Sequence, residues 1–578
     1  MMQNAEIARV LDEVAEMLEV KGENFFRVRA YRNAARAIRD HPAAVAGLDQ
    51  KALDEIPGIG ADLAGKITTL AKTGEFELHR QLAGEVPRGL LELLNVPGLG
   101  PKRVKLLAER LKVRDAASLL KAVKAGQLKG IRGFGPKMER QIMGALSHGE
   151  AEAPARILYR DAADIAAALE EHLRKSGAVD NAKVAGSFRR RRETIGDLDI
   201  LASSADPEGV TRHFLAFDGI ARTLGSGETK STVVLKSGLQ VDLRVVPAAS
   251  YGAALAYFTG SKAHNVHLRR IAQARGMLLN EYGLFRGDKP IAGKDEHGVY
   301  RALGLPWITP ELREDRGEIE AAQDGRLPTL VERDDLRGDL HTHSTYTDGR
   351  SSIEEMARAA KDAGLEYFAL TDHSRHLTMV HGLDPERLRE QRREVERVRA
   401  AVHGITILHG IEVDILEDGS LDLPDDALAE LDWVVASVHF KLNQPPREMT
   451  RRLTQAIRNP YVDVIGHPSN RLLNQREPSN FDMGEIMKVA REEGCALEIN
   501  SQPQRLDLTD TACAAAREAG VKLVISSDSH HTSGFGLLGF GVNQARRGWI
   551  EAAEVVNTQS LAALRRHRRR RNLASDSR

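Results

Sequence analysis

The stretch Val184-Ala-Gly-Ser-Phe-Arg-Arg-Arg-Arg-Glu-Thr-Ile-Gly-Asp-Leu-Asp-Ile-Leu201 decides how the rest of the chain is interpreted. It predicts a strand, a tight Gly-Ser turn with basic residues, and a second strand that carries Asp197 and Asp199. Side chains two residues apart on a strand project to the same face, so these carboxylates can hold one or two hard cations between them. Mg²⁺ suits such a site, because it accepts a few carboxylate oxygens and fills its other positions with water and substrate phosphates.

A third carboxylate, Asp242, follows in the sequence. The residues Lys236-Ser-Gly238 separate two alternating runs, which is typical of a hairpin and places Asp242 on the second strand. Two close carboxylates on a strand are, on their own, more often a solvated edge than a metal site. The Gly186-Ser187 turn favours the metal interpretation, because its small residues let backbone N–H groups approach a phosphate, and Arg189 and Arg190 add positive charge.

These segments, together with Val241-Asp-Leu-Arg244 and Tyr257-Phe-Thr-Gly-Ser261, resemble the palm of a family X DNA polymerase, the DNA polymerase beta group. The resemblance implies that Asp197, Asp199 and Asp242 are catalytic and hold two Mg²⁺ ions. It implies a DNA contact at the template for Arg269. It further implies that the nucleotide is bound by Arg156, Gly186, Ser187, Arg190, Tyr257, Phe258, Gly260, Lys262 and Asn265.

Two positions depart from the family pattern. Lys262 stands where DNA polymerase beta has an acidic residue, and it is expected to add a contact to the nucleotide. Gln240 replaces an arginine that often precedes the third aspartate by two residues. The second departure bears on how the primer 3′-OH is activated, and not on the metal site itself.

Residues 1–150 have the helical pattern of small bundles with short glycine-containing breaks. Three of these breaks resemble helix-hairpin-helix turns: Ile56-Pro-Gly-Ile-Gly60, Val96-Pro-Gly-Leu-Gly100 and Ile131-Arg-Gly-Phe-Gly135. Glycines permit the sharp turn, and the next helix offers unpaired N–H groups to a DNA phosphate without reading sequence. An ordinary glycine-rich turn is the alternative for any single copy. Three copies followed by basic residues favour DNA binding by Gly58, Gly60, Gly98, Gly100, Lys102, Gly133 and Gly135.

The first repeat carries a candidate nucleophile, Lys66. It stands where the polymerase beta family has the Schiff-base lysine that removes a 5′ sugar phosphate, and Tyr31 also matches the family as a DNA contact. Asp62 occupies the position where a helping lysine often sits. An amine beside a carboxylate tends to stay protonated and non-nucleophilic, so Lys66 is expected to be either a weak lyase or a phosphate contact only.

Past Asp334 the pattern changes to short apolar strands alternating with helical stretches, which predicts a parallel sheet or barrel. Seven strands are expected, around Leu336–Leu340, Tyr367–Leu370, Thr406–Ile411, Trp433–Ser437, Val462–Ile465, Ala496–Ile499 and Lys522–Ser526. Polar side chains gather at the carboxyl ends of these strands, where barrel enzymes place their chemistry. They are His341, His343, Asp348, His373, Glu412, His439, His467, Asp528 and His530.

A lone histidine at a strand end is more often a hydrogen-bonded filler than a ligand, but nine such donors indicate a cluster of three metal ions. Mixed imidazole and carboxylate donors suit Zn²⁺, Mn²⁺ or Fe better than Mg²⁺. The run resembles the polymerase-and-histidinol-phosphatase (PHP) domain, a seven-stranded barrel that hydrolyses phosphoesters. The resemblance implies a 3′-5′ exonuclease and, in some members, cleavage at abasic sites, with Mn²⁺ or Zn²⁺ as cofactor.

The fold class expected for the whole chain is multidomain, α+β and α/β. The expected parts are a helical DNA-end-binding domain (1–80), a helix-hairpin-helix subdomain (81–150), a nucleotidyltransferase palm (151–260), a subdomain at the nascent base pair (261–315), a linker (316–335), a PHP nuclease (336–564) and a basic tail (565–578). The tail is expected either to add non-specific DNA affinity or to be a frayed end.

Composition limits the cellular setting. Basic and acidic residues balance at 82 each, so net charge argues neither for nor against nucleic acid. The two cysteines, Cys495 and Cys513, offer no C-x-x-C spacing for a thiolate metal site. No apolar run reaches the roughly 18 residues that a membrane span needs. We therefore expect a soluble cytoplasmic protein that acts as a monomer.

The function expected from these motifs is DNA synthesis across short gaps in base excision repair, on gapped or nicked DNA with a 5′-phosphate and with deoxynucleoside triphosphates. Two alternatives stay open. The chain can be a repair scaffold whose active sites are relics, or a polymerase whose barrel is a small-molecule phosphatase or pyrophosphatase. Loops rather than ligands set the substrate of such a barrel.

Overall fold

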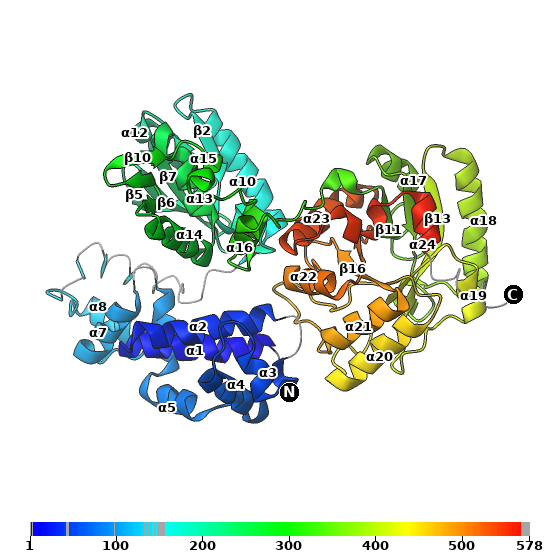
Figure 1. The fold of residues 1–578 in the computed structure, drawn as a ribbon, viewed down its shortest axis with the longest axis horizontal. Helices are drawn as coiled ribbons and strands as arrows, with labels where there is room; N and C mark the ends of the chain where they lie inside the picture. The colour runs from blue at the N-terminus through cyan, green and yellow to red at the C-terminus, as the bar shows by residue number, and fades with distance from the viewer. Residues whose placement is uncertain are drawn as a thin grey trace. The chain divides into compact units, whose positions relative to one another are not determined.

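The computed structural model describes residues 2, 4–41, 45–96, 99–131, 134, 135, 138, 139, 142, 143, 146 and 156–567. The chain divides into two compact units, Met1–Ala155 and Arg156–Arg578 (Figure 1). Of the predicted DNA-binding glycines, Gly98 and Gly133 lie outside the described residues, as does most of the basic tail. Among the described residues, no helix is both long enough and apolar enough to cross a membrane.

The first unit is helical, as predicted. Its helices are α1 (Asn4–Lys21), α2 (Phe25–Asp40), α3 (Gln50–Asp54), α4 (Ala61–Thr73), α5 (Glu77–Glu85), α6 (Arg88–Glu92), α7 (Pro101–Leu111) and α8 (Ala116–Lys124). Helices α1 and α2 lie side by side and bury apolar side chains such as Leu11, Val14 and Ile38. Gly60 and Gly100 directly precede α4 and α7, so two of the predicted hairpin glycines stand at helix starts.

The second unit begins with a five-stranded sheet in the order β2-β4-β7-β6-β5. Its strands are β2 (Asn181–Val184), β4 (Asp197–Ser203), β5 (Ile220–Ser226), β6 (Lys230–Leu235) and β7 (Gln240–Val246). Two short strands, β1 (Ile157–Leu158) and β3 (Thr194–Ile195), pair beside it, and the helices α10 (Tyr159–Arg174) and α12 (Pro207–Leu215) complete this region. Leu198 and Ile200 of β4 face the core, which turns the alternating Asp197 and Asp199 to the other face.

The predicted Gly-Ser turn is helical. Gly186 leaves β2 at φ 61° and starts the four-residue helix α11 (Gly186–Arg189). The N–H groups of Arg189 and Arg190 bond to the carbonyls of Ala185 and Gly186, which closes the helical turn. A left-handed residue followed by a helical turn reverses the chain as a tight turn would, which is why the two patterns look alike in sequence.

The following region contains α13 (Tyr251–Thr259), α14 (Lys262–Ala274), α15 (Glu296–Ala302) and a three-stranded sheet of β8 (Leu278–Asn280), β9 (Gly283–Arg286) and β10 (Lys289–Ala292). Residues 316–335, expected to be a linker, include the helix α16 (Glu318–Gln323). Glu318 is fully buried and bonds to the ring of His264 at 2.6 Å. At least this charge of the segment is therefore satisfied inside the fold, although the sequence pattern alone resembles a solvated connector.

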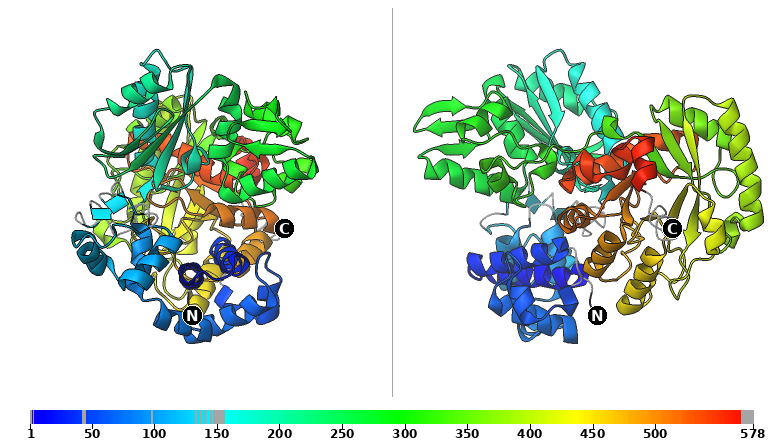
Figure 2. Two further views of the ribbon diagram at one scale, coloured as in Figure 1. Left: turned by 90° about the vertical axis from the view of Figure 1, so that its left-hand side faces the viewer. Right: turned by 45° about the vertical axis from the view of Figure 1, so that its right-hand side comes forward.

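The last region is the predicted seven-stranded parallel sheet, with its strands in sequence order from β11 to β17. The strands are β11 (Gly338–Thr342), β12 (Tyr367–Leu370), β13 (Thr406–Asp414), β14 (Trp433–Ser437), β15 (Val464–Ile465), β16 (Ala496–Asn500) and β17 (Leu523–Ser526). The helices are α17 (Ile353–Asp362), α18 (Pro385–Ala401), α19 (Asp425–Ala429), α20 (Pro446–Arg458), α21 (Met483–Glu493), α22 (Asp510–Ala519), α23 (Leu538–Arg547) and α24 (Leu561–His567). Helices α18 and α20 to α22 lie outside the strands (Figures 1 and 2).

The two edge strands of this sheet approach each other, so the sheet is a nearly closed barrel. Thr342 pairs with Ser529, and the His343 N–H donates to the Ser529 carbonyl at 2.8 Å. At the opposite end, the Asn557 side chain donates to the carbonyls of Gly338 and Ile525, both at 2.7 Å. Every strand thus directs its carboxyl end to one rim, where parallel barrels place their chemistry.

Candidate active sites in the palm and the barrel

The palm carboxylates lie on two adjacent strands. Strand β4 pairs in parallel with β7, and the register puts Asp199 directly beside Asp242 and Asp197 beside Gln240. Burial, together with the negative charges of Asp197 and Asp242, raises the pKa of Asp199 to about 7. Crowded, desolvated carboxylates of this kind gain most when a cation binds between them, so the donor set fits a divalent metal.

Asp242 is held in place by its neighbours. It accepts hydrogen bonds from the hydroxyl of Thr232 and from the Gln240 amide at 2.9 Å, and the Lys230 ammonium lies 3.7 Å away. Gln240, the residue that departs from the family pattern, therefore helps to fix the orientation of the Asp242 carboxylate. As an amide it carries no charge, so it does not act as a base for the primer hydroxyl.

Gly186 makes room for the metal site. A Cβ atom built at this position would lie 2.5 Å from Oδ2 of Asp199, and the backbone is in the left-handed region at φ 61°. Both conditions exclude other residues, because an added side chain would displace the carboxylate as well as strain the backbone. Ser187 follows as the second residue of α11.

The predicted nucleotide-binding arginines are held beside this turn. Arg190 donates from Nε to Glu314 at 3.0 Å and from Nη1 to the Thr259 carbonyl at 2.8 Å. Arg156 donates from Nε to the Thr194 hydroxyl at 2.9 Å. Arg189 has a different role, because both its terminal nitrogens bind the buried carboxylate of Glu296, at 2.8 and 2.7 Å.

The other predicted nucleotide-binding residues meet at the end of α13. The Asn265 amide donates to the carbonyls of Tyr257 and Gly260, at 2.6 and 3.3 Å, and Arg269 donates from Nε to the Asn265 carbonyl at 3.3 Å. The rings of Tyr257 and Phe258 contact edge to face, with centroids 5.2 Å apart. Lys262 lies in the first turn of α14, just before Asn265. The Asn265 amide thus ties the start of α14 to the end of α13.

The nine predicted barrel ligands converge at the carboxyl ends of the strands. Three groups, each with ligand atoms within 4.8 Å of one another, occur in the described part of the chain: His343, Asp348, His373 and His530; His341, His343 and Asp528; His373, Glu412 and His439. His467, the remaining member, lies 3.0 Å from Glu412 through Nε2. Shared members link the groups into one cluster, which matches the predicted arrangement for several ions.

Buried ring nitrogens in this cluster make no hydrogen bond: Nε2 of His341, both nitrogens of His343, Nδ1 of His373 and Nδ1 of His467. Orphaned buried donors and acceptors are costly, so their concentration here fits metal coordination. Burial and the neighbouring His530 and His373 lower the pKa of His343 to about 3, whereas nearby carboxylates raise the pKa of His341, His373, His439 and His530. Metal binding to these four would release protons.

Two carboxylates that sequence reasoning missed orient the ligands. Glu498 of β16 binds Nδ1 of His341 at 2.7 Å and accepts the His467 backbone N–H at 2.6 Å. Asp414 of β13 lies 3.0 Å from Nδ1 of His439. Such partners fix the tautomer and ring orientation of a ligating histidine. The available signal was a buried acidic residue on an otherwise apolar strand, as in Ala496-Leu-Glu-Ile-Asn500.

In the first unit, Lys66 and Asp62 form the expected ion pair across one helical turn, at 2.5 Å. Burial alone would lower the pKa of Lys66, but the hydrogen bonds and charge interactions with Asp62 and Tyr31 together outweigh burial and raise the pKa. The ammonium also lies 5.6 Å from the centroid of the Tyr31 ring, so the two family-matching residues are neighbours. Gly58 adopts φ 96° before α4, as a sharp hairpin turn requires.

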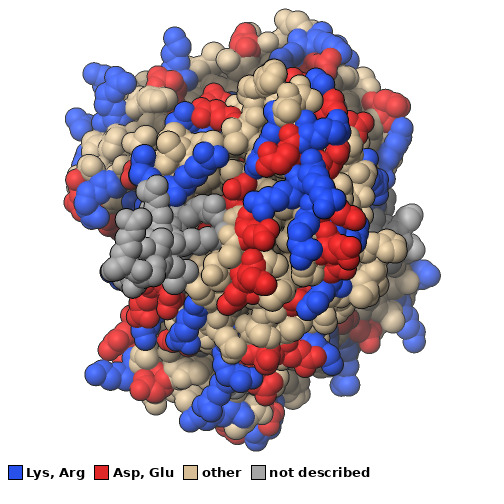
Figure 3. Space-filling model, turned by 90° about the vertical axis from the view of Figure 1, so that its right-hand side faces the viewer, with Lys and Arg blue, Asp and Glu red and all other residues tan. Residues whose placement is uncertain are grey.

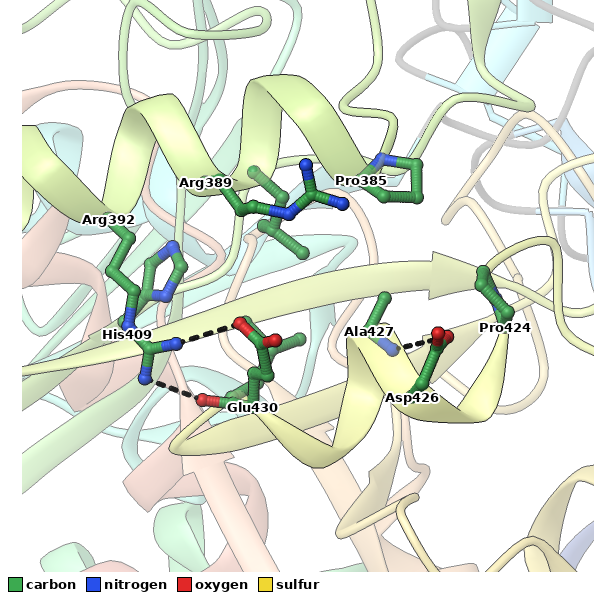
Figure 4. A pocket seen from close by; sticks show the side chains of 10 residues that line it. Pro385, Arg389, Arg392, His409, Pro424, Asp426, Ala427 and Glu430 are labelled. Carbon is green, nitrogen blue, oxygen red and sulfur yellow. Dashed lines mark hydrogen bonds and ion pairs between the residues drawn. The ribbon is translucent and has the colours of Figure 1, made fainter.

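A separate groove lies on the outside of the barrel, between α18 and α19 (Figure 4). It is lined in part by Arg389, Arg392, His409 and Glu430. Arg392 already donates one hydrogen bond to the side-chain carboxylate of Glu430, at 3.0 Å, and one to its backbone carbonyl, at 2.9 Å. None of the nine cluster ligands lines this groove, so it is not part of the metal site.

Comparison with known proteins decides the family. The chain is 39% identical to the DNA polymerase/3′-5′ exonuclease PolX of Bacillus subtilis (strain 168) over 565 residues, which is 97% of this chain and 98% of that protein. The chain belongs to this family of PHP-containing family X DNA polymerases. Family descriptions match in parts: a helix-hairpin-helix domain (2–76), a SAM-like helix-hairpin-helix tandem (90–147), a DNA polymerase beta thumb (254–314) and a PHP domain (339–502).

Two further relatives cover parts of this family X chain. DNA polymerase lambda of Rattus norvegicus is 26% identical over 354 residues, 54% of this chain and 56% of that protein. A "probable phosphatase" of Thermoanaerobacter sp. (strain X514) is 32% identical over 240 residues, 38% of this chain and 89% of that protein. The predicted fold class, with a helical start, a mixed middle and a PHP barrel, is confirmed.

Proposed function

We propose that this protein fills short DNA gaps in base excision repair and that its barrel is a 3′-5′ exonuclease that also cleaves abasic sites. The observation that carries this proposal is that the predicted palm carboxylates lie on paired strands and that the predicted barrel ligands converge into a second, separate cluster. A repair scaffold with relic sites would have no need to keep buried histidine nitrogens crowded against carboxylates without hydrogen bonds of their own. The full-length relative bears both activities in its name.

In the palm, Asp197, Asp199 and Asp242 would hold two Mg²⁺ ions, which when bound supply the charge that aligns the primer hydroxyl and neutralises the leaving pyrophosphate. The chain's own residues bind and orient the nucleotide and the template. Arg156, Ser187 and Arg190 bind the triphosphate, while Tyr257 and Phe258 line the sugar and disfavour a 2′-hydroxyl. Asn265 and Arg269 face the nascent pair and template.

In the barrel, the nine ligands would hold three Mn²⁺ or Zn²⁺ ions, which when bound supply an activated water and neutralise the phosphodiester. Glu498 and Asp414 keep His341 and His439 in the ligating tautomer. The chain is proposed to work as a monomer on gaps with a 5′-phosphate. It is proposed to work in the cytoplasm, where bacterial DNA is repaired.

A second function of the barrel is favoured by one comparison, since a free-standing relative that matches the barrel is called a probable phosphatase. The full chain should therefore be offered a gapped duplex with four deoxynucleotides, a 3′-recessed duplex without nucleotides, and a phosphomonoester, each with Mg²⁺, Mn²⁺ or Zn²⁺. We expect gap filling and 3′ digestion to exceed phosphomonoester hydrolysis by orders of magnitude. Hydrolysis of the monoester alone would assign the barrel to small molecules, and no reaction with any substrate would support a scaffold.

A further inference from the structure

The palm and the barrel share a buried contact centred on Arg547, the last residue of α23. Its side chain is 2% exposed. Nη1 donates to the backbone carbonyl of Arg190 at 2.7 Å and to Glu314 at 3.1 Å, and Nη2 donates to Asp510 at 2.6 Å. One guanidinium from the barrel therefore holds the palm backbone at Arg190, the carboxylate of Glu314 just before the predicted linker, and a carboxylate of the barrel itself.

Glu314 connects Arg547 of the barrel to the side chain of Arg190 in the palm. It lies between Arg547 and Arg190, whose Nε donates to it at 3.0 Å. Arg192 lies 3.8 Å away on the exposed side. Burial alone would raise the pKa of Glu314, but Arg547, Arg190 and Arg192 lower it to about 2, so the carboxylate is ionised throughout the working pH range.

The side chain of Arg190 is thereby fixed at two of its three nitrogens, Nε by Glu314 and Nη1 by the Thr259 carbonyl. Within the described residues no bond engages Nη2. A long arginine side chain that is already ordered loses less conformational entropy when a phosphate binds to its remaining nitrogen. The geometry explains how a residue of the nuclease domain can influence a substrate it does not touch.

We propose that Arg547 of the barrel is a positioning residue for nucleotide binding in the palm, because it fixes Glu314 and the backbone of Arg190, and through them the guanidinium that receives the triphosphate. This inference rests on the proposed nucleotide-binding role of Arg190. It predicts that the polymerase depends on the contact surface of the barrel while remaining independent of the barrel's metal ligands.

The opposite effect would follow if Glu314 competed with the triphosphate for Arg190. In that case loosening Glu314 would strengthen nucleotide binding. The two possibilities differ in the sign of one measurable quantity, the KM for the incoming nucleotide.

The test uses the full chain with Arg547→Met and measures single-nucleotide insertion into a gapped duplex. We expect the KM for the deoxynucleotide to rise about tenfold, equivalent to about 1.4 kcal/mol, with kcat and the KM for DNA within about twofold of the parent. Arg547→Lys, which keeps the charge but not the three-way bonding, should recover part of the loss. Intact 3′ digestion and an unchanged midpoint of thermal unfolding would show that the fold survives.

Arg546→Met is the matched control. Arg546 is the neighbouring residue, is also buried, and binds Glu311 at 2.9 Å rather than Glu314. An equal rise of the nucleotide KM in this variant, or an unchanged or lowered KM in Arg547→Met, would overturn the inference. If Arg547→Met does not fold, Arg547→Lys and Asp510→Asn carry the same comparison.

Arg190→Ala separates this inference from the proposed function. An unchanged nucleotide KM in Arg190→Ala would remove the premise that Arg190 binds the triphosphate. A raised KM in Arg190→Ala with an unchanged one in both Arg547 variants would leave the proposed function standing and defeat only the role of Arg547.

Discussion

At the scale of single residues, the neighbour of Lys66 determines which chemistry its amine can do. A Schiff base needs a neutral amine, which proteins obtain by desolvating a lysine or by placing another cation beside it. Here the neighbour is Asp62, and the pKa of Lys66 is raised. A raised pKa lowers the neutral fraction at pH 7, and that fraction grows as the pH rises toward the pKa.

We therefore predict weak 5′-sugar-phosphate lyase activity that increases toward alkaline pH, and a gain at neutral pH in Asp62→Lys. Borohydride trapping on an incised abasic site across a pH series measures both. Efficient trapping at pH 7 by the parent chain that disappears in Lys66→Ala would contradict this expectation. No trapping at any pH would leave Lys66 as a phosphate contact.

Residue types alone singled out the nine side chains that converge in the barrel, because nearly every one of them lies at the carboxyl end of an apolar strand. They did not predict Glu498, since a single glutamate inside a strand carries no information about which histidine it faces. Nor did they predict that Arg189 is committed to Glu296, 107 residues away, because adjacent arginines look equivalent until the fold separates them.

At the scale of strands and helices, each catalytic cluster is built by one set of strand ends. The palm aspartates depend on the β4–β7 pair, and His341 and His343 depend on the end of β11. Replacing Asp197 and Asp199 together with Ala should abolish primer extension and leave 3′ digestion near the parent rate, because the metal-held geometry supplies most of the catalysis.

Replacing His341 and His343 with Ala should abolish 3′ digestion and leave primer extension near the parent rate. It should also lower the amount of metal bound per chain. Primer extension, 3′ digestion and metal content in the same preparations check both variants. Appreciable extension by the palm variant, or persistent 3′ digestion by the barrel variant, would place the corresponding activity elsewhere in the chain.

Strand β16 contributes to the nuclease without supplying a ligand. Glu498→Gln should weaken metal binding by about 10- to 100-fold, because an amide is a weaker acceptor for the His341 ring N–H than a carboxylate. Metal titration of the apo chain measures this, with 3′ digestion at saturating metal as the second readout. Glu485→Gln on the exposed face of α21 is the control. Equal metal affinity in Glu498→Gln and Glu485→Gln would mean that the Glu498 carboxylate does not contribute to metal binding.

At the scale of the whole molecule, DNA binding has to come from local surfaces. Basic and acidic side chains intermingle over the face drawn in Figure 3, in keeping with equal totals of 82. The helix-hairpin-helix unit offers Lys66 and the start of α4 to a phosphate. We predict tighter binding to a short gap with a downstream 5′-phosphate than to one with a 5′-hydroxyl, and affinity that falls steeply with salt.

Fluorescence anisotropy of the two gapped duplexes at several salt concentrations checks this prediction. Equal affinities for both ends at moderate salt would count against an end-binding site in the first unit. Lys66→Ala should reduce the difference between the two ends, while Lys51→Ala, outside the hairpin, should not.

The order of the domains could be predicted from the sequence, whereas the way the last two domains join could not. Residues 311–320 look like a solvated connector because they are charged. In the structure Glu311 binds Arg546, Glu314 binds Arg190 and Arg547, and Arg316 binds Asp510. Ion pairs between residues about 200 apart in sequence produce no local pattern in the sequence. Only the folded chain therefore shows that residues 311–320 pack between the palm and the barrel.

The closure of the barrel by Asn557 also has an evolutionary consequence. This residue bonds to both the first and the last strand, so the points where the chain enters and leaves the barrel lie side by side. A domain with adjoining ends can be joined to or cut from another coding sequence without breaking a strand. A free-standing relative that matches 38% of this chain over 89% of its own length is what such recombination would leave behind.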